Sequence, residues 1–483
     1  MNTLDTDYLV IGAGTAGLAF ADTLISESDA HITLVDRRGK PGGHWNDAYS
    51  FVTLHQPSAF YGVNSLELGS GRKDSIGPNQ GLYELASGAE VTGYFDRVLQ
   101  SKLLPSGRVT WLPMSEYQGA GRVQSLLSGD ITQINVRRKL VDANHYGPTI
   151  AATHSPRFTV AEGAALVPPN ALPGLWHGRQ ALPGAVLPRQ FVVIGAGKTA
   201  MDTCCWLLSA GAPASAITWV VPRDSWLINR RTTQPGAEFF FDAIGNQAEQ
   251  MAALAEATSV ADLYLRLEAC GALLRIDPSR TPTMFHLATI SSGEVELLRS
   301  ITNVVRLGRV QAIASDHMLL DQGRVELGQG ALYIDCTASA VEPRPVQPIF
   351  QDQKIVLQLV RLPQPAFSAA LIAYVEAHGA SAVKDAAKDG MTEDQAKNAL
   401  CATVPFPHTL ADYPRALAVG MRNQAAWGAD KALRQWIRNS RLDAFTRVMM
   451  AVDPSDTEKI AVMARLKERA AAAAANLPRL FKA

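Results

Sequence analysis

Paired cysteines are missing from this sequence, and their absence excludes two kinds of site. The chain has five cysteines, and no two of them form a CxxC or CxxxxC pair. Neither a zinc site nor a redox-active dithiol is predicted, and no metal site is expected. An odd number of cysteines also suits a reducing compartment. The cysteines are Cys204, Cys205, Cys270, Cys336 and Cys401.

An excess of charge of either sign is missing as well. Lys plus Arg and Asp plus Glu number 45 each, so the formal net charge is zero. Bulk electrostatics therefore attract neither nucleic acid nor an anionic membrane. Charged residues are 19% and hydrophobic residues 47% of the 483, a balance typical of a large interior with buried parallel sheets. We expect an α/β protein of two or three domains.

Long apolar runs are missing too. Residues 1–7 lack the basic stretch of a secretory signal, and the apolar run after them is too short for a signal or a membrane span. We therefore expect a cytoplasmic protein with no membrane partner. The alanine-rich run 469–476 gains too little in lipid to cross a membrane. A capping or oligomer-contact helix is the favoured interpretation, so a homo-oligomer stays open.

What the chain does contain is one pattern used twice: an apolar strand, a glycine-rich turn, a helix and a second strand. The first copy has a strand at 8–11, the turn Gly12-Ala-Gly14-Thr-Ala-Gly17, a helix at 18–25 and a strand at 32–35. The second copy has a strand at 191–194, the turn Gly195-Ala-Gly197-Lys-Thr-Ala200, a helix at 201–208 and a strand at 217–221. Two Rossmann-like dinucleotide-binding domains are predicted.

Proline- and glycine-rich stretches mark the joints between these domains. Each stretch follows an apolar run closed by threonine, at 149–153 and at 332–337, where we expect the chain to leave one domain for the other. The second domain is therefore predicted to be inserted into the first, and helical spacing at 431–450 and 456–480 predicts a helical C-terminal extension. The expected division is 1–185 and 332–380 for the first domain, 186–331 for the inserted domain and 381–483 for the extension.

Each residue of the first turn has a physical task. Gly12 permits the tight turn, Gly14 lets a pyrophosphate approach the helix N-terminus, and Gly17 lets helix and strand pack closely. Asp36, at the end of the next strand, would accept hydrogen bonds from ribose hydroxyls. The residues alone predict FAD or NAD at this turn.

The second turn differs where its second strand ends. Arg223 stands there in place of a carboxylate, and Arg230 follows closely. A carboxylate would repel a 2′-phosphate, whereas a guanidinium pairs with it bidentately. This site is predicted to take NADP(H), although a solvated surface arginine at 223 is the plain alternative.

With these motifs the chain resembles the flavin-containing and related class B flavoprotein monooxygenases over roughly residues 1–375. The resemblance rests on the first turn with Asp36, on Gly42-Gly43-His44-Trp45, on Gly195 to Asp202 and on Arg223 to Arg230. It implies FAD at the first turn and NADPH at the second. By resemblance the FAD contacts include Arg37, Gly43 and Trp45, and the NADPH contacts include Lys198 and Thr199 at the phosphates and Arg223 and Arg230 at the 2′-phosphate. Thr153 and Thr337 match the threonines of the family's strand-closing Ala-Thr-Gly turns.

The chain also departs from that family. His154 and Ala338 replace the glycines of the two Ala-Thr-Gly turns, and the family's Phe-x-Gly-x-x-x-His stretch is not found between Thr153 and Arg189. Where flavin-containing monooxygenases place an asparagine near the flavin, this chain reads Leu54-His55-Gln56-Pro57.

His55 and Gln56 are the candidate catalytic residues. They are polar residues in an apolar and aromatic stretch, 49–61, that the resemblance places beside the flavin. A hydrogen-bond donor there could stabilise negative charge on oxygen, and a histidine with an ordinary pKa near 6.5 could move a proton. The alternative is an interior polar pair satisfied by the backbone.

The function predicted from these observations is an FAD-containing, NADPH-dependent monooxygenase that acts on a small organic substrate with O₂. One alternative is an NADPH-dependent flavin oxidase or dehydrogenase that releases hydrogen peroxide or reduces another acceptor. A second is a non-catalytic flavin- or nucleotide-binding sensor or scaffold. A disulfide reductase is disfavoured because the cysteines are not paired.

Overall fold

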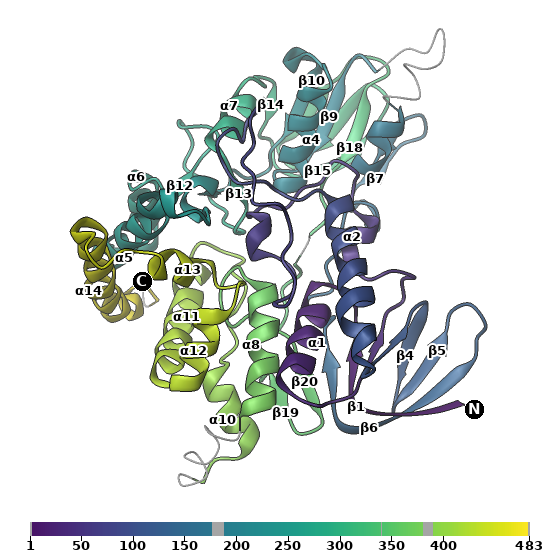
Figure 1. Cartoon of the computed structure of the whole chain (residues 1–483). Helices are drawn as coiled ribbons and strands as arrows, with labels where there is room; N and C mark the ends of the chain where they lie inside the picture. The colour runs from purple at the N-terminus through teal and green to yellow at the C-terminus, as the bar shows by residue number, and fades with distance from the viewer. Residues whose placement is uncertain (1, 176–187, 340, 380–389, 482–483) are drawn as a thin grey trace.

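Two parallel sheets and a layer of helices make up the computed structural model, which describes residues 2–175, 188–339, 341–379 and 390–481 (Figure 1). The elements up to the first crossing between the sheets are β1 (Asn2–Ile11), α1 (Thr15–Glu27), β2 (Ile32–Val35), α2 (Gly88–Val98), β3 (Val109–Leu112), β4 (Ser115–Gly119), β5 (Arg122–Ser125) and β6 (Ile131–Asp142). The return segment adds β19 (Phe350–Gln351), β20 (Lys354–Val356) and α8 (Pro365–His378).

The first sheet has the order β19-β20-β6-β1-β2-β3, with the β4–β5 hairpin attached to the antiparallel start of β6. Its central strand β1 pairs in parallel with β2 and β6, which brings Ile11 beside Val35 on one side and Asp142 on the other. Leu9 and Val10 are fully buried, as expected for a parallel strand covered on both faces. The helices α1 and α8 pack against each other on one face (Figure 1). The glycine-rich turn therefore opens at the carboxyl edge of this sheet.

The second sheet repeats this arrangement with the order β14-β10-β9-β18-β8. The pairings between its described strands are parallel, and Ile194 at the end of β9 lies beside Val220 and Asp335. Its elements and their neighbours are β7 (Thr159–Val160), β8 (Ala165–Val167), β9 (Phe191–Ile194), α4 (Lys198–Ser209), β10 (Ile217–Val220), α7 (Ser292–Arg299), β14 (Val304–Val305), β15 (Val310–Ile313), β16 (His317–Leu320), β17 (Gly323–Glu326) and β18 (Leu332–Asp335). The expected fold class, two Rossmann-like units with a helical C-terminal region, is confirmed.

Strand pairing differs from the expected division of the chain in two places. Residues 159–167 contribute β7 and β8, which pair with β15 and β18 of the second unit. Residues 332–335 form β18, which pairs with β9 and not with the first sheet. We therefore propose that the inserted domain extends from about residue 159 to 335. The expected boundaries at 185 and at 380 lie outside the described residues.

The run at 149–153 was expected to close a strand of the first domain, and this expectation is wrong. Residues 149–150 have no regular structure and residues 151–153 form a turn whose last two residues are exposed, whereas the strand beside β1 is β6, which ends at Asp142. The chain from Asn144 to Phe158 is thus the first crossing between the two sheets.

A helical region inserted into the second domain was not predicted. It contains α5 (Asn246–Glu256), α6 (Val260–Ala269) and a small sheet of β11 (Leu227–Asn229), β12 (Leu273–Leu274) and β13 (Thr289–Ile290). The C-terminal helix α14 (Thr457–Leu480) packs along α5, and its Asn476 donates hydrogen bonds to the carbonyls of Leu254 and Ala257 (2.8 and 2.9 Å). These contacts cap the end of α5, in agreement with the capping interpretation of the alanine-rich run.

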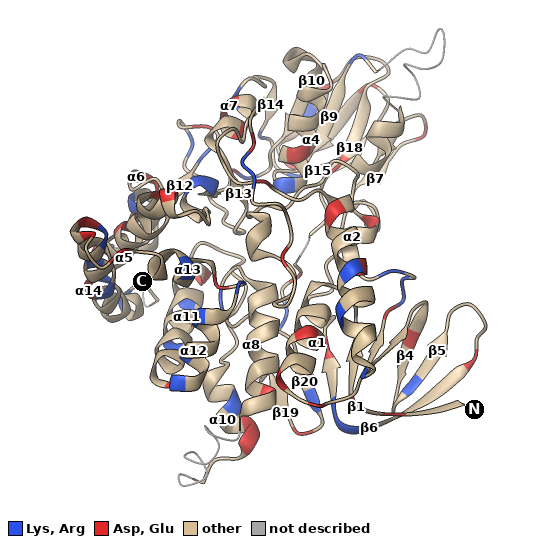
Figure 2. Ribbon diagram, viewed as in Figure 1, with Lys and Arg blue, Asp and Glu red and all other residues tan. Residues whose placement is uncertain are grey.

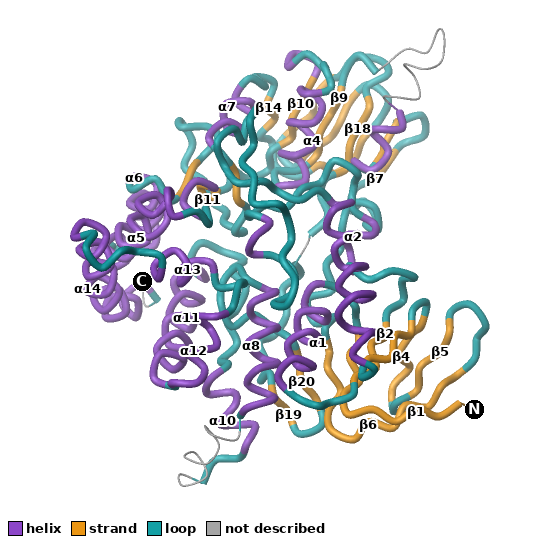
Figure 3. The backbone as a smooth tube through the Cα atoms, viewed as in Figure 1, coloured by secondary structure: helices purple, strands orange, loops and turns teal. Residues whose placement is uncertain are grey.

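The rest of the C-terminal extension covers the first domain. It consists of α10 (Glu393–Leu400), α11 (Asp412–Ala429), α12 (Lys431–Asn439) and α13 (Ala444–Met450), which Figure 3 shows as a layer of helices beside α8. Helical spacing over 431–450 predicted one helix, but two helices form, with a break at 440–443. The extension therefore contacts both domains.

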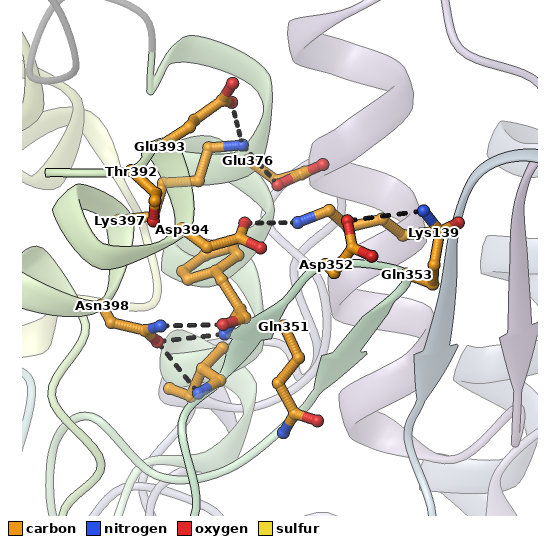
Figure 4. Close-up of polar contacts among 12 residues, drawn as sticks. Lys139, Gln351, Asp352, Gln353, Glu376, Thr392, Glu393, Asp394, Lys397 and Asn398 are labelled. Carbon is orange, nitrogen blue, oxygen red and sulfur yellow. Dashed lines mark hydrogen bonds and ion pairs between the residues drawn. The ribbon is translucent and has the colours of Figure 1, made fainter. Parts of the chain in front are cut away.

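Buried polar contacts fasten α10 to the first sheet (Figure 4). Asn398 accepts hydrogen bonds from the amides of Ile349 and Phe350 and donates one to the carbonyl of Phe350, so it covers the outer edge of β19. Lys397 is buried between Glu376 (2.7 Å) and Glu393 (2.6 Å). A sheet edge left unpaired would be a template for aggregation, and α10 blocks it.

Charge is distributed without a face of one sign, and Figure 2 shows acidic and basic residues interspersed along both domains and the extension. Within the described ranges, no helix is both long and apolar enough to span a membrane.

The Lys397 cluster yields a stability prediction. Lys397→Met should lower the free energy of unfolding by roughly 3–5 kcal/mol, because the carboxylate of Glu376, itself 5% exposed, would stay buried without its cation. Guanidinium unfolding followed by tryptophan fluorescence measures the change. The matched control is Lys459→Met, since Lys459 forms a half-exposed pair with Asp456 and should change stability by less than about 1 kcal/mol. Equal losses in the two variants would contradict the prediction.

Candidate active site

The first glycine-rich turn is shaped by close contacts of its own backbone. Gly12 has φ +107°, and a Cβ there would lie 2.5 Å from Oδ1 of Asn144. A Cβ on Gly17 would lie 1.9 Å from the carbonyl oxygen of Gly12. Gly14 is different, because its Cβ would meet only Gly43 Cα at an ordinary 3.6 Å. Gly12 and Gly17 are thus required by the fold, whereas the backbone around Gly14 would tolerate a methyl group.

The helices that follow the two turns begin without caps. The N-cap residues of α1 and α4 are Gly14 and Gly197, and neither helix has a side-chain cap or an acidic residue in its first turn. By contrast, α2, α7 and α10 each begin with a complete capping box. The amides of a first helical turn need acceptors, and the positive end of the helix dipole favours an anion. Both turns therefore fit the pyrophosphate of a dinucleotide.

Asp36 lies where the sequence placed it, at the end of β2, and is 7% exposed. Its carboxylate accepts hydrogen bonds from the amides of Ala13 (2.7 Å) and Arg38 (2.8 Å). Asp36 thereby holds the glycine-rich turn against β2. Arg37 is exposed and lies 3.4 Å from Glu116, so only its backbone is part of this turn.

Gly43 and Trp45 face the first turn from the segment after β2. Gly43 lies against Gly14, and Trp45 Nε1 donates a hydrogen bond to the hydroxyl of Tyr61 (2.7 Å). That hydroxyl also makes a short hydrogen bond with the hydroxyl of Thr15, the first residue of α1. The N-terminus of α1 is therefore tied to both segments that line it. Tyr61 was not among the predicted site residues.

The strand-closing residue of the first domain is Asn144 and not Thr153. Asn144 follows β6 and touches Gly12, while Thr153 is exposed and bonds only to the carbonyl of Ile150 (3.3 Å). In the second domain the expectation agrees with the geometry. A Cβ on Gly195 would lie 2.7 Å from the carbonyl oxygen of Cys336, and Thr337 follows at once.

Thr337 is held in the second strand-closing turn by Asp335. Its amide and hydroxyl donate hydrogen bonds to Oδ1 of that carboxylate (2.9 and 2.6 Å). His154 Nε2 lies 3.1 Å from the same hydroxyl. The two crossings between the domains therefore touch here, although Thr153 itself takes no part.

A cavity of about 340 Å³ lies beside the second turn, at the carboxyl ends of β9 and β10. Ala196 of the turn, Trp219 and Arg223 are among its lining residues. Three other arginines in the lining are committed to protein partners: Arg275 to Glu268, Arg306 to Asp224 and Asp277, and Arg299 to backbone carbonyls.

Arg223 differs from these three arginines. It is exposed and forms no ion pair or hydrogen bond with the rest of the described chain. Burial of part of its side chain and the nearby Arg309 lower its pKa, the direction expected of a cation that lacks a counter-charge. Arg223 is therefore available to an anionic ligand in this cavity.

Lys198 and Arg230 were expected at the NADPH phosphates, but they lie in a buried cluster of charges. Lys198 Nζ pairs with Asp202 and with Glu294 (3.1 Å), and Arg230 Nη1 pairs with Glu294 (2.8 Å). The Arg230 side chain has no exposed surface and also bonds Asn79 from the first domain. Sequence spacing could not show this, because Glu294 and Asn79 come from distant segments. The helix begins earlier than the expected 201, so Thr199 lies in the first turn of α4, and its contact with the NADPH phosphates stays a prediction.

The aromatic segment of the first domain packs directly on α4 of the second. The Tyr49 hydroxyl donates a hydrogen bond to Asp202 (2.8 Å), and Phe51 stacks on Trp206 with ring centroids 5.0 Å apart. Burial and the neighbouring Asp202 carboxylate raise the Tyr49 pKa well above its ordinary value. The segment 49–51 of the first domain is thus joined to the helix that follows the second turn.

His55 and Gln56 lie just beyond this contact and are half-buried. Neither side chain makes a hydrogen bond to another described residue, so the alternative of a polar pair satisfied by the backbone is not what the structure contains. Burial, followed by the charge of Lys198, lowers the pKa of His55 to about 4. At neutral pH its ring is uncharged, and a titration near pH 6.5 is not expected.

The cysteines of the described chain are all free, and Cys204, Cys336 and Cys401 are buried. Burial raises the pKa of Cys204 well above its ordinary value and that of Cys336 to about 12. Such thiols are poor nucleophiles. Core packing, as predicted for Cys204 and Cys205, fits this environment.

Comparison with known proteins agrees with this geometry. The sequence profile described as pyridine nucleotide-disulphide oxidoreductase matches residues 6–242. Uncharacterised proteins of Mycobacterium tuberculosis (strain ATCC 25618 / H37Rv) and Mycobacterium bovis (strain ATCC BAA-935 / AF2122/97) are 42% identical over 481 residues, which cover 100% of this chain and 85% of theirs.

Among solved structures, the polycyclic ketone monooxygenase of the thermophilic fungus Thermothelomyces thermophila matches 98% of this chain and 89% of its own, with a TM-score of 0.51 and 12% identity. At that identity the likeness concerns the fold alone. The chain belongs to one protein family with these mycobacterial proteins, its residues 6–242 match the pyridine nucleotide-disulphide oxidoreductase profile, and it has the fold of this monooxygenase.

Proposed function

We propose that this protein is an FAD-containing, NADPH-dependent monooxygenase that transfers one oxygen atom from O₂ to a small organic substrate. The observation that carries the proposal is the contact of residues 49–51 with α4, which brings the two domains together close to the side chains of His55 and Gln56. Both glycine-rich turns lead into helices without side-chain caps. The proposed reaction consumes one NADPH, one proton and one O₂ for each oxygenated product and each water that it forms.

FAD fits the first turn for two reasons. The amides at the start of α1 have no side-chain cap, and beside them Gly14 and Gly43 meet through backbone atoms, with no side chain between them. Bound there, FAD would accept hydride from NADPH and react with O₂. Gly43, Trp45 and the turn held by Asp36 would then fix the pyrophosphate end of the cofactor.

NADPH fits the second turn through Arg223. The cavity contains one arginine without a protein partner among the described residues, at the end of β10 where a 2′-phosphate would lie. The charge-assisted pair between a guanidinium and this phosphate would select NADPH over NADH. Arg230 is excluded from this role because it is buried against Glu294.

Gln56 and His55 would act where oxygen reacts. The Gln56 amide can donate a hydrogen bond to negative charge on oxygen, and His55, neutral because burial lowers its pKa to about 4, can donate or accept one proton at a ring nitrogen. The rings of Tyr49 and Phe51 pack together before them, with centroids 4.6 Å apart, and would limit the access of water. An oxidase that releases hydrogen peroxide is the competing function. The amount of peroxide released per NADPH consumed separates the two functions.

The first prediction here concerns FAD. Gly14→Ala should leave the melting temperature nearly unchanged, because its Cβ meets only an ordinary contact, yet it should reduce flavin occupancy at least about tenfold by blocking the pyrophosphate. Gly17→Ala is the matched variant. It should lose stability with or without flavin, because its Cβ overlaps the Gly12 carbonyl. Flavin absorbance per protein and thermal melting distinguish the two, and full occupancy in Gly14→Ala would reject the site.

The second prediction concerns the coenzyme. Arg223→Ala should reduce kcat/KM for NADPH about 10- to 100-fold, the equivalent of roughly 1.5–3 kcal/mol, and leave NADH use nearly unchanged. Arg309→Ala is the control, since Arg309 is a neighbouring arginine that does not line the cavity. Flavin reduction rates with both coenzymes provide the measurement. Equal losses with NADPH and NADH would assign Arg223 to folding instead.

The third prediction concerns oxygen. Gln56→Leu removes a donor with little change of volume, so NADPH consumption should continue while hydrogen peroxide rises towards one equivalent per NADPH. Peroxide is measured with and without catalase in the presence of candidate substrates. Wild-type protein that converts all its NADPH to peroxide with every substrate would favour the oxidase, and a Gln56→Leu variant identical to wild type would remove Gln56 from the site.

A further inference from the structure

Arg441 lies in the break between α12 and α13, far along the chain from either nucleotide turn, and is 7% exposed. Its guanidinium donates hydrogen bonds to the carbonyls of three alternate residues in one backbone segment: Ala59 (2.8 Å), Tyr61 (2.6 Å) and Val63 (2.8 Å). It also lies 3.2 Å from the hydroxyl of Tyr94. One cation from the C-terminal extension thus holds the segment 59–63.

A buried carboxyl group on α1 holds the end of the same segment. Asp22 is 1% exposed, and its carboxylate accepts hydrogen bonds from the amide of Ser65 (3.0 Å) and from the Ser65 hydroxyl. Burial raises the pKa of Asp22, while the Ser65 contacts and the charge of Arg441 act in the opposite direction. Ser440 adds a hydrogen bond to Asn64 (2.9 Å). The segment 59–65 is therefore fixed between α1 and the extension.

Tyr61 connects this clamp to the first nucleotide turn. Its carbonyl accepts from Arg441, while its hydroxyl bonds Thr15 at the start of α1 and Trp45 beside Gly43. Burial raises the pKa of Tyr61 to about 12, so the hydroxyl keeps its proton at neutral pH. The same segment begins just after His55 and Gln56, so its position also sets theirs.

We propose that Arg441 is a positioning residue of the FAD site, acting through Tyr61 on the N-terminus of α1 and on the segment that carries His55 and Gln56. This inference rests on the proposed function for the identity of the cofactor. Its structural part, the clamp on residues 59–63, stands without it. The helical extension is then a component of the cofactor site as well as a cover for the first domain.

The physical reason is the geometry of a guanidinium. It offers five N–H donors in a rigid plane, so one side chain can satisfy three buried carbonyls and a hydroxyl together. Lysine carries the same charge on a compact ammonium with three donors and cannot reproduce that arrangement. A positive charge alone should therefore not hold the segment 59–63. Arg441→Lys keeps the charge and removes the planar arrangement of donors, so it separates these two contributions.

The experiment compares Arg441→Lys with Arg438→Lys in the full-length protein. Arg438 lies three residues earlier on α12, is exposed, and has no ion pair or hydrogen bond within the described ranges. Two readouts are used: amide hydrogen exchange of residues 57–65 in flavin-free protein, and the Kd for FAD from quenching of flavin fluorescence. Tyr61→Phe is the third variant, because it removes the hydroxyl that links the clamp to Thr15 and Trp45.

We expect Arg441→Lys to raise exchange in residues 57–65 at least about tenfold and to weaken FAD binding about 10- to 100-fold, with Arg438→Lys unchanged in both. Tyr61→Phe should weaken FAD binding while exchange in the segment stays near wild type. A lower melting temperature with an unchanged Kd for FAD in Arg441→Lys would overturn the proposal and leave Arg441 as a docking contact only.

The two hypotheses fail in different ways. Wild-type protein that binds no FAD would reject the proposed function and with it the cofactor role of Arg441. Wild-type protein that binds FAD tightly, together with Arg441→Lys protein of equal affinity, would reject only the role of Arg441.

Discussion

At the two glycine-rich turns, backbone atoms approach one another more closely than a side chain would permit. The rest of the structure depends on these close contacts. At Gly17 the carbonyl of Gly12 occupies the place of a Cβ, and at Gly195 the carbonyl of Cys336 nearly does so. The end of the strand and the start of the following helix can then lie close together at the edge of each sheet. The consequence is a pair of uncapped helix N-termini, in a chain whose other helices are often capped by serine or threonine. Two positive helix ends without protein partners are what a dinucleotide needs.

The junction between the domains uses buried charge. Lys198, Asp202, Glu294 and Arg230 compensate one another, and the first domain adds Tyr49 and Asn79 to the same cluster. Removing one member of such a cluster leaves another charge buried and unpaired, so the arrangement resists change. This explains why Lys198 can follow the second turn directly and yet be directed away from it. Arg223, whose guanidinium has no protein partner in the described chain, is the arginine that we propose for the nucleotide phosphate.

The C-terminal extension connects these parts. Asn398 and Lys397 close the edge of the first sheet, Asn476 caps α5 of the second domain, and Arg441 holds the segment that follows His55 and Gln56. Lys397 pairs with a buried carboxylate, whereas Asn398, Asn476 and Arg441 satisfy backbone groups. Such contacts specify geometry because an unpaired partner would be costly. The C-terminal extension thereby lies next to the proposed cofactor site.

Local chemistry in the sequence was sufficient for several elements. The strands at 191–194 and 32–35, the three glycines of the first turn, Asp36 and Arg223 were all predicted from spacing within one strand–turn–helix unit, because there the decisive contacts are between near neighbours. The site at His55 and Gln56 stays a prediction, and their lack of protein partners is a result of the tertiary structure.

Only the folded chain decided the remainder. Asn144, and not Thr153, lies at the first turn because β6 ends at Asp142. The strand β6 is partly exposed and contains three basic residues, 137–139, so its sequence does not resemble a buried parallel strand. Arg230 is withdrawn from the nucleotide by Glu294 and Asn79, which lie 64 and 151 residues away in sequence. Arg441 reaches the segment at 59–63 from 378 to 382 residues away. Partners so distant leave no periodicity or motif in the sequence, since their meeting depends on how sheets and helices pack and not on local backbone preference.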